Sequence, residues 1–121
     1  MIEPIQFSID ENVTAKMLLK NGFMQHDNSY IYKKCLYYFD NTKAPYVTFK
    51  MTAFFADGEP YMMYSITRDD GCCYPAFYDT TVRHDNKVYE KIVEEYNKIV
   101  SRMIDNEILK RYEEDKNGGN N

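Results

Sequence analysis

The most reactive side chains of this sequence are three cysteines and two histidines. Cys72 and Cys73 are adjacent, and neighbouring side chains of a strand point to opposite faces, so we expect one buried and one exposed thiol. The pair lacks the Cys-x-x-Cys spacing of zinc and thioredoxin sites, and an odd number of cysteines does not form a disulfide framework. We therefore predict reduced thiols that act as small hydrophobic residues, with a redox role left open.

Each histidine has an aspartate as its neighbour, in the pairs His26-Asp27 and His84-Asp85. A histidine beside a carboxylate can serve in acid–base catalysis, but in a turn such a pair is commonly solvated. The sequence contains no Gly-x-Ser-x-Gly motif, no glycine loop for phosphate and no metalloprotease helix. We therefore predict no catalytic residue, no metal site and no cofactor, and we expect a protein that is not an enzyme.

Chain length and net charge narrow the possible domain organisation and function. A chain of 121 residues is long enough for one domain with a single core. Its net charge of −4 disfavours direct nucleic-acid binding, which needs clustered Lys and Arg, and suits a basic partner instead. No apolar run reaches membrane-spanning length, and the N-terminal residues are acidic and interrupted by Pro4, so we expect a cytoplasmic protein.

The longest apolar pattern runs from about Asp85 to about Tyr112 and predicts the helix that organises the fold. At about 100° per residue, its apolar residues share one arc of roughly 160° as far as Ile104. A stripe of that width predicts a helix packed along a large apolar surface. Beyond Ile104 the stripe ends, and Ile108, Leu109 and Tyr112 project elsewhere.

Two arrangements would account for this second patch. The helix breaks near Asp105-Asn106, or it continues as a straight overhang that packs against another partner. In the second case residues 105–112 would form a homodimer interface through Ile108, Leu109 and Tyr112. Deletion from Ile108 onward would then leave a folded monomer.

A shorter helix is predicted near the N-terminus, from about Ile9 to Asn21. Ser8 and Glu11 have the spacing of a capping box, while Asp10 is a competing N-cap. Gly22 can adopt the left-handed conformation that ends a helix in a Schellman motif, in which Phe23 would contact Leu18.

Between the two helices the hydrophobic period changes to two, which indicates strands. A hairpin over 23–38 turns at Asp27-Asn28, and strands follow at 46–55 and 61–68, with a weaker edge strand over 72–78. We predict an α+β fold: an N-terminal helix, an antiparallel four- to five-stranded meander and a long C-terminal helix, with both helices packed on one sheet face. Residues 1–112 would form one domain, and the polar residues 113–121 a disordered tail.

Tyrosine is unusually abundant, with 12 Tyr and 7 Phe but no Trp. One sheet face must receive the helices, and the other carries Tyr, Thr and Lys. That second face is either the ordinary half-buried side of a sheet or an aromatic surface that binds a protein. The candidate partner-binding residues are Tyr30, Tyr32, Tyr46, Tyr61 and Tyr64 on the strands, together with Ile108, Leu109 and Tyr112.

Three features of the chain are characteristic when taken together: the segment Leu18-Leu19-Lys20-Asn21-Gly22-Phe23, the tyrosine-rich strands, and the closing helix with Val88 to Tyr96. In this it resembles the small accessory proteins of bacteriophages and mobile elements. The resemblance implies a protein that acts by binding, such as an anti-CRISPR or other inhibitor of a host defence nucleoprotein complex. The alternatives are a small-ligand or nucleotide-derivative binding protein and a structural subunit of a larger assembly.

Overall fold

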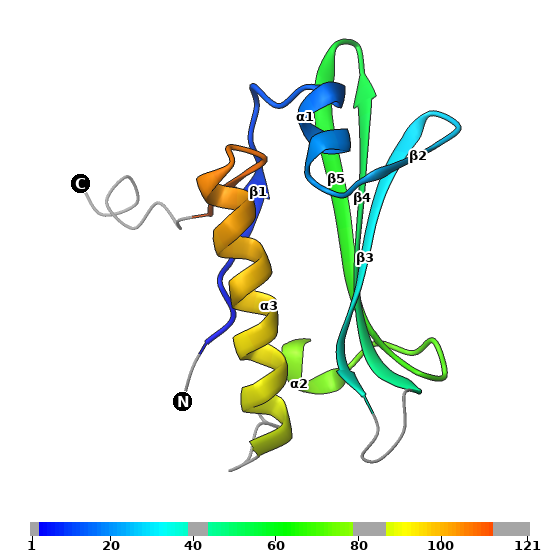
Figure 1. Ribbon diagram of the computed structural model, residues 1–121, viewed down its shortest axis with the longest axis vertical. Helices are drawn as coiled ribbons and strands as arrows, with labels where there is room; N and C mark the ends of the chain where they lie inside the picture. Colours follow the sequence, from blue (N-terminus) through cyan, green and yellow to red (C-terminus); the bar gives the residue numbers. More distant parts are fainter. Residues whose placement is uncertain (1–2, 39–43, 79–86, 113–121) are drawn as a thin grey trace, which may run out of the picture.

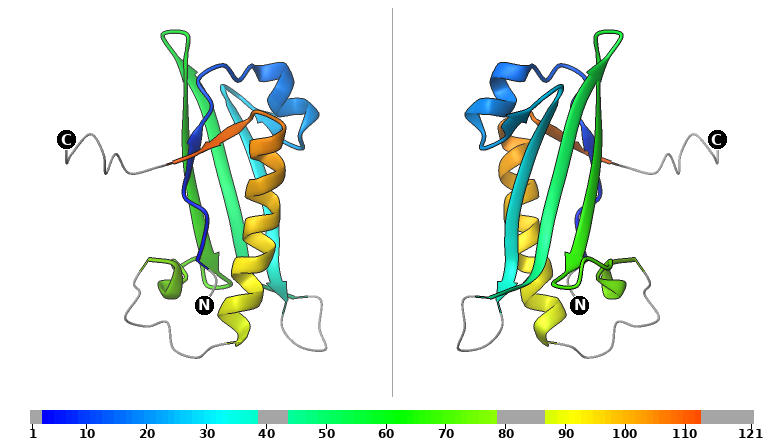
Figure 2. Two further views of the ribbon diagram at one scale, coloured as in Figure 1. Left: turned by 90° about the vertical axis from the view of Figure 1, so that its left-hand side faces the viewer. Right: turned by 90° about the vertical axis from the view of Figure 1, so that its right-hand side faces the viewer.

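The computed structural model describes residues 3–38, 44–78 and 87–112. In chain order the elements are β1 (Phe7–Ile9), α1 (Ala15–Lys20), β2 (Met24–His26), β3 (Ser29–Tyr38), β4 (Pro45–Ala56), β5 (Glu59–Arg68), α2 (Pro75–Tyr78), α3 (Lys87–Asp105) and β6 (Leu109–Arg111). The predicted α+β class is confirmed. An antiparallel sheet of order β2-β3-β4-β5 has α1 and α3 on one face, and β1 and β6 form a separate two-stranded sheet (Figures 1 and 2).

Helix α3 covers the inner face of the sheet, as its apolar stripe predicts (Figure 1). The stripe residues are buried: Tyr89, Ile92, Val93, Tyr96, Ile99, Val100 and Met103. Strand β4 contributes Val47, Phe49, Met51 and Ala53 to the same core, all fully buried. The apolar face of β4, which repeats every two residues, therefore packs against the apolar face of α3, which repeats every 3.6 residues.

The C-terminal part of the predicted helix is wrong, because α3 ends at Asp105 and the chain reverses. Glu107 has φ +64°, and Ile108 N–H donates to Met103 O over 2.9 Å, which is a Schellman ending. Of the two arrangements considered for residues 105–112, the break is the one present. The expected N-cap of this helix, Asp85 or Asn86, lies outside the described residues.

After the reversal, β6 pairs antiparallel with β1, with Ser8 opposite Lys110 and Ile9 opposite Leu109. Ile108 and Leu109 are fully buried in the core. The prediction that they form an exposed dimer patch is therefore wrong, because the turn directs both side chains back into the domain. Tyr112 alone of the predicted C-terminal contacts remains exposed.

The predicted start of the first helix is also wrong. Residues 7–9 form β1, and Asp10 N–H donates to Ile108 O over 2.9 Å. The helix begins after Thr14, whose Oγ1 accepts a hydrogen bond from Met17 N–H at 3.2 Å. The capping signals of Ser8 and Asp10 were real local preferences, but pairing with β6 overrides them.

The predicted end of that helix is confirmed. Gly22 has φ +94°, and Phe23 N–H donates to Leu18 O over 3.1 Å. The hairpin that follows is confirmed too, with His26 opposite Ser29 and Asp27 at positive φ. The chain then enters the four-stranded sheet in the predicted meander order.

The predicted strand over 72–78 is not formed. Pro75 to Tyr78 make the short helix α2, and the segment before it joins the sheet through the single bridge of Thr67 with Cys73. Proline is well suited to the first turn of a helix, because its missing N–H has no partner there. Among the residues described, the main sheet therefore has four strands.

The hydrophobic core is one cluster that extends in sequence from Val13 to Leu109. Residues 113–121, predicted to be a disordered tail, lie outside the described part of the chain. No helix in the described ranges is long and apolar enough to span a membrane.

The two Schellman endings lead to a pair of predictions with opposite signs. We expect Gly22→Ala to lower the free energy of unfolding by about 1–2 kcal/mol, because a left-handed residue gains a Cβ. That Cβ would also lie 3.3 Å from the Tyr32 ring. We expect Glu107→Gly to raise stability by about 0.5–1 kcal/mol, because glycine adopts this conformation without strain. Urea unfolding of the two variants checks both signs, and a loss of stability in Glu107→Gly would contradict this account.

Candidate functional site

The face of the main sheet opposite α1 and α3, here named the outer face, is covered by no described element (Figure 2, right). Directly paired residues of antiparallel strands point to the same side, so the register assigns the side chains of this face in rows. Running across β2-β3-β4-β5, the rows are His26-Ser29-Phe54-Tyr61, Met24-Ile31-Thr52-Met63, Lys33-Lys50-Ser65 and Cys35-Thr48-Thr67.

The first two rows lie near the β4–β5 turn and contain the apolar side chains of this face, here named the apolar patch: Met24, Ile31, Phe54, Tyr61 and Met63. Phe54 and Tyr61 are stacked, with ring centroids 5.5 Å apart and planes 20° apart. Met24 and Met63 are 74% and 63% exposed, which is unusual for large apolar side chains. Ile31 lies half-buried between them in the second row. Contiguous apolar side chains on a free face mark an interaction surface more often than single exposed ones do.

The third row is basic. Lys33 is directly opposite Lys50, and Lys50 is opposite Ser65. Like charges directly opposed across two strands destabilise a sheet. No carboxylate among the described residues forms an ion pair with either lysine. The surface around them is hollowed into a shallow concavity of about 570 Å³, whose other lining residues include Thr48, Thr67, Arg68 and Asp69.

Of the five predicted strand tyrosines, the structure places only Tyr61 on the outer face. Tyr30 and Tyr32 are opposite Ala53 and Met51 and therefore face the core. Tyr32 is buried, and its hydroxyl accepts a hydrogen bond from Arg102 Nη2 at 3.2 Å.

The other two tyrosines lie apart from this face. Tyr64 faces inward at the β5 edge, with its ring centroid 4.8 Å from that of Phe7. Tyr46 is half-buried at the start of β4, and its ring contacts those of Tyr37 and Tyr74. The predicted tyrosine surface is therefore not one surface.

The apolar residues that do form the patch were missed. Met24, Ile31, Phe54 and Met63 come from four strands, and no local pattern shows that they are neighbours. One signal was present, since the alternation that places Thr48, Lys50 and Thr52 on one side of β4 continues to Phe54.

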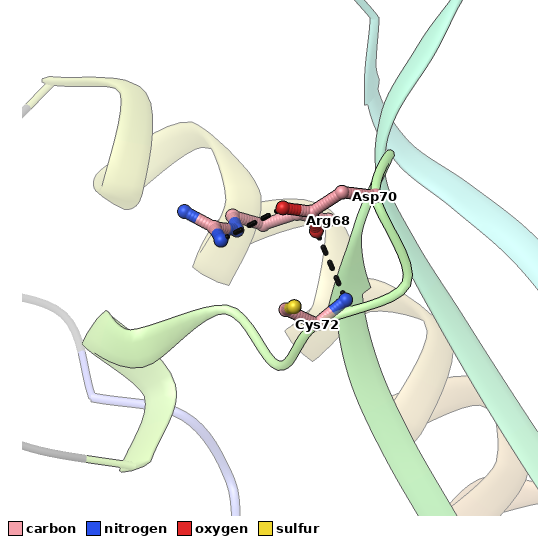
Figure 3. Close-up of polar contacts among 3 residues, drawn as sticks. All are labelled: Arg68, Asp70 and Cys72. Atoms are coloured by element: carbon pink, nitrogen blue, oxygen red, sulfur yellow. Dashed lines mark hydrogen bonds and ion pairs between the residues drawn. The ribbon is translucent and has the colours of Figure 1, made fainter.

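In the turn after β5, one carboxylate accepts hydrogen bonds from a side chain and from the backbone (Figure 3). Asp70 accepts from Arg68 Nη2 at 2.9 Å and, through its other oxygen, from Cys72 N–H at 2.9 Å. The Cys72 amide and, to a smaller extent, the Arg68 guanidinium hold the pKa of the Asp70 carboxyl below its usual range. Both carboxylate oxygens are thus occupied in shaping the turn.

The candidate reactive groups within the described ranges, the adjacent cysteines and His26, lie apart from one another. Cys72 and Cys73 are both exposed, so the expectation of one buried thiol is wrong, because the segment is a turn and not a strand. His26 Nδ1 lies 3.8 Å from Asp27 in the β2–β3 turn, and both side chains are largely exposed. His84 lies outside the described residues. Within the described ranges no group of three His, Cys, Asp or Glu side chains could hold a metal ion.

No protein-family model and no curated protein matches the sequence. The fold, however, is similar to that of a DUF1831 family protein from Lactobacillus plantarum, known from its crystal structure. The TM-score is 0.69, with 18% sequence identity over 88% of this chain and 86% of that one. An identity this low supports a likeness of fold and does not extend to residues of a site. The chain therefore shares the architecture of that DUF1831 family protein over most of its length.

Proposed function

We propose that this chain is a non-enzymatic protein-binding module. Its outer face binds a partner protein through a surface of that partner that is apolar and flanked by acidic side chains. The observation that carries the proposal is that Met24, Ile31, Phe54, Tyr61 and Met63 share one sheet face, covered by no described element, with the directly opposed Lys33 and Lys50.

The apolar rows suit a protein partner. Aromatic residues and Met are enriched at the centre of protein interfaces, and stacked rings such as Phe54 and Tyr61 supply large contact area at a low entropic cost. Met24 and Met63 add flexible side chains that adapt to an irregular partner surface. The patch spans all four strands, so its backbone is already held by the sheet and does not need to be ordered on binding.

The lysine row indicates the sign of the charge on the partner surface. The chain as a whole carries a net charge of −4, which by itself would suit a basic partner. On the outer face, however, Lys33 and Lys50 oppose each other, and neither forms an ion pair with a described carboxylate, although Asp69 lines the same concavity. An acidic group on the partner would relieve their repulsion. Two lysines are too few for a nucleic-acid groove, which favours an acidic protein surface.

We expect the double variant Lys33→Glu/Lys50→Glu to weaken partner capture by about tenfold or more, because attraction to acidic groups becomes repulsion. The measurement is affinity capture from the native host at two salt concentrations, with identification and cross-linking of the captured protein. Lys98→Glu, on the solvent side of α3, is a charge-reversal control away from the outer face and should capture as the unchanged protein does.

The cross-linked site on the partner should contain apolar and acidic residues. Unchanged capture by the double variant, a nuclease-sensitive partner or cross-links that avoid the outer face would each contradict the proposal. A second copy of this chain as the captured species would also contradict it. The narrower role implied by the resemblance, inhibition of a host defence complex, stays a prediction that the identity of the partner would test.

A further inference from the structure

The concavity on the outer face holds hydroxyl side chains as well as the lysine row. The pairing register places Lys50 between Lys33 and Ser65, and in the next row it places Thr48 opposite Thr67. All five residues line the concavity. Directly paired side chains of neighbouring strands have Cβ atoms about 4.5–5.5 Å apart, so their polar ends can reach one bound group. The sheet therefore gathers two ammonium groups and three hydroxyls around one hollow.

These five groups are not used to hold the described part of the fold together. Neither lysine forms an ion pair with a described carboxylate, and none of the three hydroxyls is hydrogen-bonded to a described residue. Arg68 also lines the concavity, but its Nη2 is already held by Asp70 at 2.9 Å (Figure 3). Two directly opposed lysines destabilise the strand pair that carries them. Folding therefore gives no reason for this arrangement, whereas binding of an anion does.

The number and kind of donors favour one class of anion. Ammonium and hydroxyl groups both donate hydrogen bonds to anionic oxygens. A carboxylate offers two oxygens and a single charge, whereas a phosphate monoester offers three strong acceptor oxygens and a charge of about −1.5 to −2 at pH 7. Two lysines match the charge of the phosphate, and the hydroxyls supply donors for the oxygens that the lysines do not reach. The donor set therefore suits a phosphate better than a carboxylate.

One lining side chain acts against an anion. Asp69 is exposed and follows the last residue of β5, so it lies beyond Thr67. Lys33 is two strands away on β3, which corresponds to about 9–10 Å across the sheet. The Asp69 carboxylate therefore lowers the affinity of the concavity for an anion without neutralising the lysine row. Removal of this charge is a direct test of the site.

The neighbouring apolar patch indicates what carries the phosphate. Lys33 follows Ile31 by two residues on β3, and Ser65 follows Met63 by two residues on β5, a spacing of about 7 Å. An inorganic phosphate ion has no apolar group that could cover the patch. A phosphorylated protein segment presents apolar side chains at this distance from its phosphate, because alternate residues of an extended chain are also about 7 Å apart.

We propose that the outer face binds a phosphorylated side chain of a partner protein, with the phosphate in the concavity and a nearby apolar side chain of the same partner on the apolar patch. This rests on the protein-binding function proposed above and specifies which acidic group the partner presents. The charge of the phosphate is assigned to Lys33 and Lys50. Its oxygens are assigned to the hydroxyls of Thr48, Ser65 and Thr67.

The first test compares two small probes, N-acetyl-phosphoserine N-methylamide and N-acetyl-glutamate N-methylamide. We expect the phosphoserine compound to bind with a Kd between about 1 and about 10 mM, as its few atoms allow. We expect the glutamate compound to bind at least about fivefold more weakly, because it has one charge and two acceptor oxygens. NMR titration of the backbone amide signals of β4 and β5 measures both. Equal binding of the two compounds, or no saturable binding of the phosphoserine compound, would overturn the proposal.

Lys33 and Lys34 offer a matched pair of variants, because they are adjacent on β3, are both exposed and point to opposite faces of the sheet. We expect Lys33→Gln to weaken binding of the phosphoserine compound about five- to tenfold, and Lys34→Gln to change it by less than about twofold. Asp69→Asn should strengthen binding about two- to threefold. Thermal unfolding establishes that each variant is folded. Equal losses in Lys33→Gln and Lys34→Gln would show a general effect of net charge and contradict the site.

Partner capture separates this inference from the protein-binding proposal. Treatment of the host extract with a phosphatase should reduce capture by the unchanged protein about tenfold or more. If capture survives the phosphatase but is still lost in Lys33→Glu/Lys50→Glu, the partner presents carboxylates. The phosphate inference is then wrong, and the protein-binding proposal stands. A free phosphate ester recovered in place of a phosphorylated protein would also overturn the inference.

Discussion

Replacing Leu109 with alanine is expected to lower the free energy of unfolding by about 2–5 kcal/mol. Leu109 is fully buried, and it is opposite Ile9 in the β1–β6 pair. The change removes apolar atoms from the core and leaves a cavity that the paired backbone cannot easily close. Equilibrium urea unfolding measures the loss.

Leu19→Ala is the matched control, because Leu19 is the same residue type but lies 48% exposed on α1. It should change stability by no more than about 0.5–1 kcal/mol. Deletion from Ile108 onward should unfold the protein, whereas a dimer overhang would have left a folded monomer. A folded, stable truncated protein would contradict the position of β6 in the core.

Replacing Phe49 with alanine is expected to lower the free energy of unfolding by about 3–5 kcal/mol. Phe49 is fully buried at the centre of β4, and its ring centroid is 5.0 Å from that of Tyr96 and 6.1 Å from that of Tyr64. Its removal therefore leaves a void between β4, β5 and α3. Urea unfolding with intrinsic tyrosine fluorescence provides the measurement.

Phe54→Ala is the control on the same strand, because Phe54 is the same residue type on the outer face and is stacked on Tyr61. It should cost less than about 1.5 kcal/mol while reducing partner capture, since its ring belongs to the proposed contact patch. If Phe54→Ala destabilised the protein more than Phe49→Ala, the assignment of the two sheet faces would be reversed.

The two helix endings show what local signals reveal. The end of α1 was predictable because glycine occupies the left-handed position, where it is strongly preferred. The end of α3 has the matching hydrogen bond, from Ile108 N–H to Met103 O, but Glu107 occupies the left-handed position, and a glutamate is no sign of a helix end. The loss of the apolar stripe after Ile104 was the remaining signal, and it allowed either a break or an overhang.

The outer face shows the limit of local patterns. Alternation along β4 correctly separates Thr48, Lys50 and Thr52 from the core residues of that strand. In β3 both faces carry tyrosine or other apolar residues, so alternation alone did not tell that Tyr32 is buried while Lys33 is exposed. The apolar patch can therefore be identified only from the pairing register of the four strands.

The sequence by itself determined the α+β class, the buried stripe of α3, the inner face of β4 and the glycine ending of α1. Each of these depends on periodicity or on a residue with a strong local preference. Only the tertiary structure decided that residues 7–9 pair with 109–111, which buries Ile108 and Leu109 and replaces a predicted helix start. It also decided which side chains share the outer face. Such neighbours come from segments far apart in the chain. The register between their strands is set by packing of the whole core, and a short stretch of sequence does not contain that information.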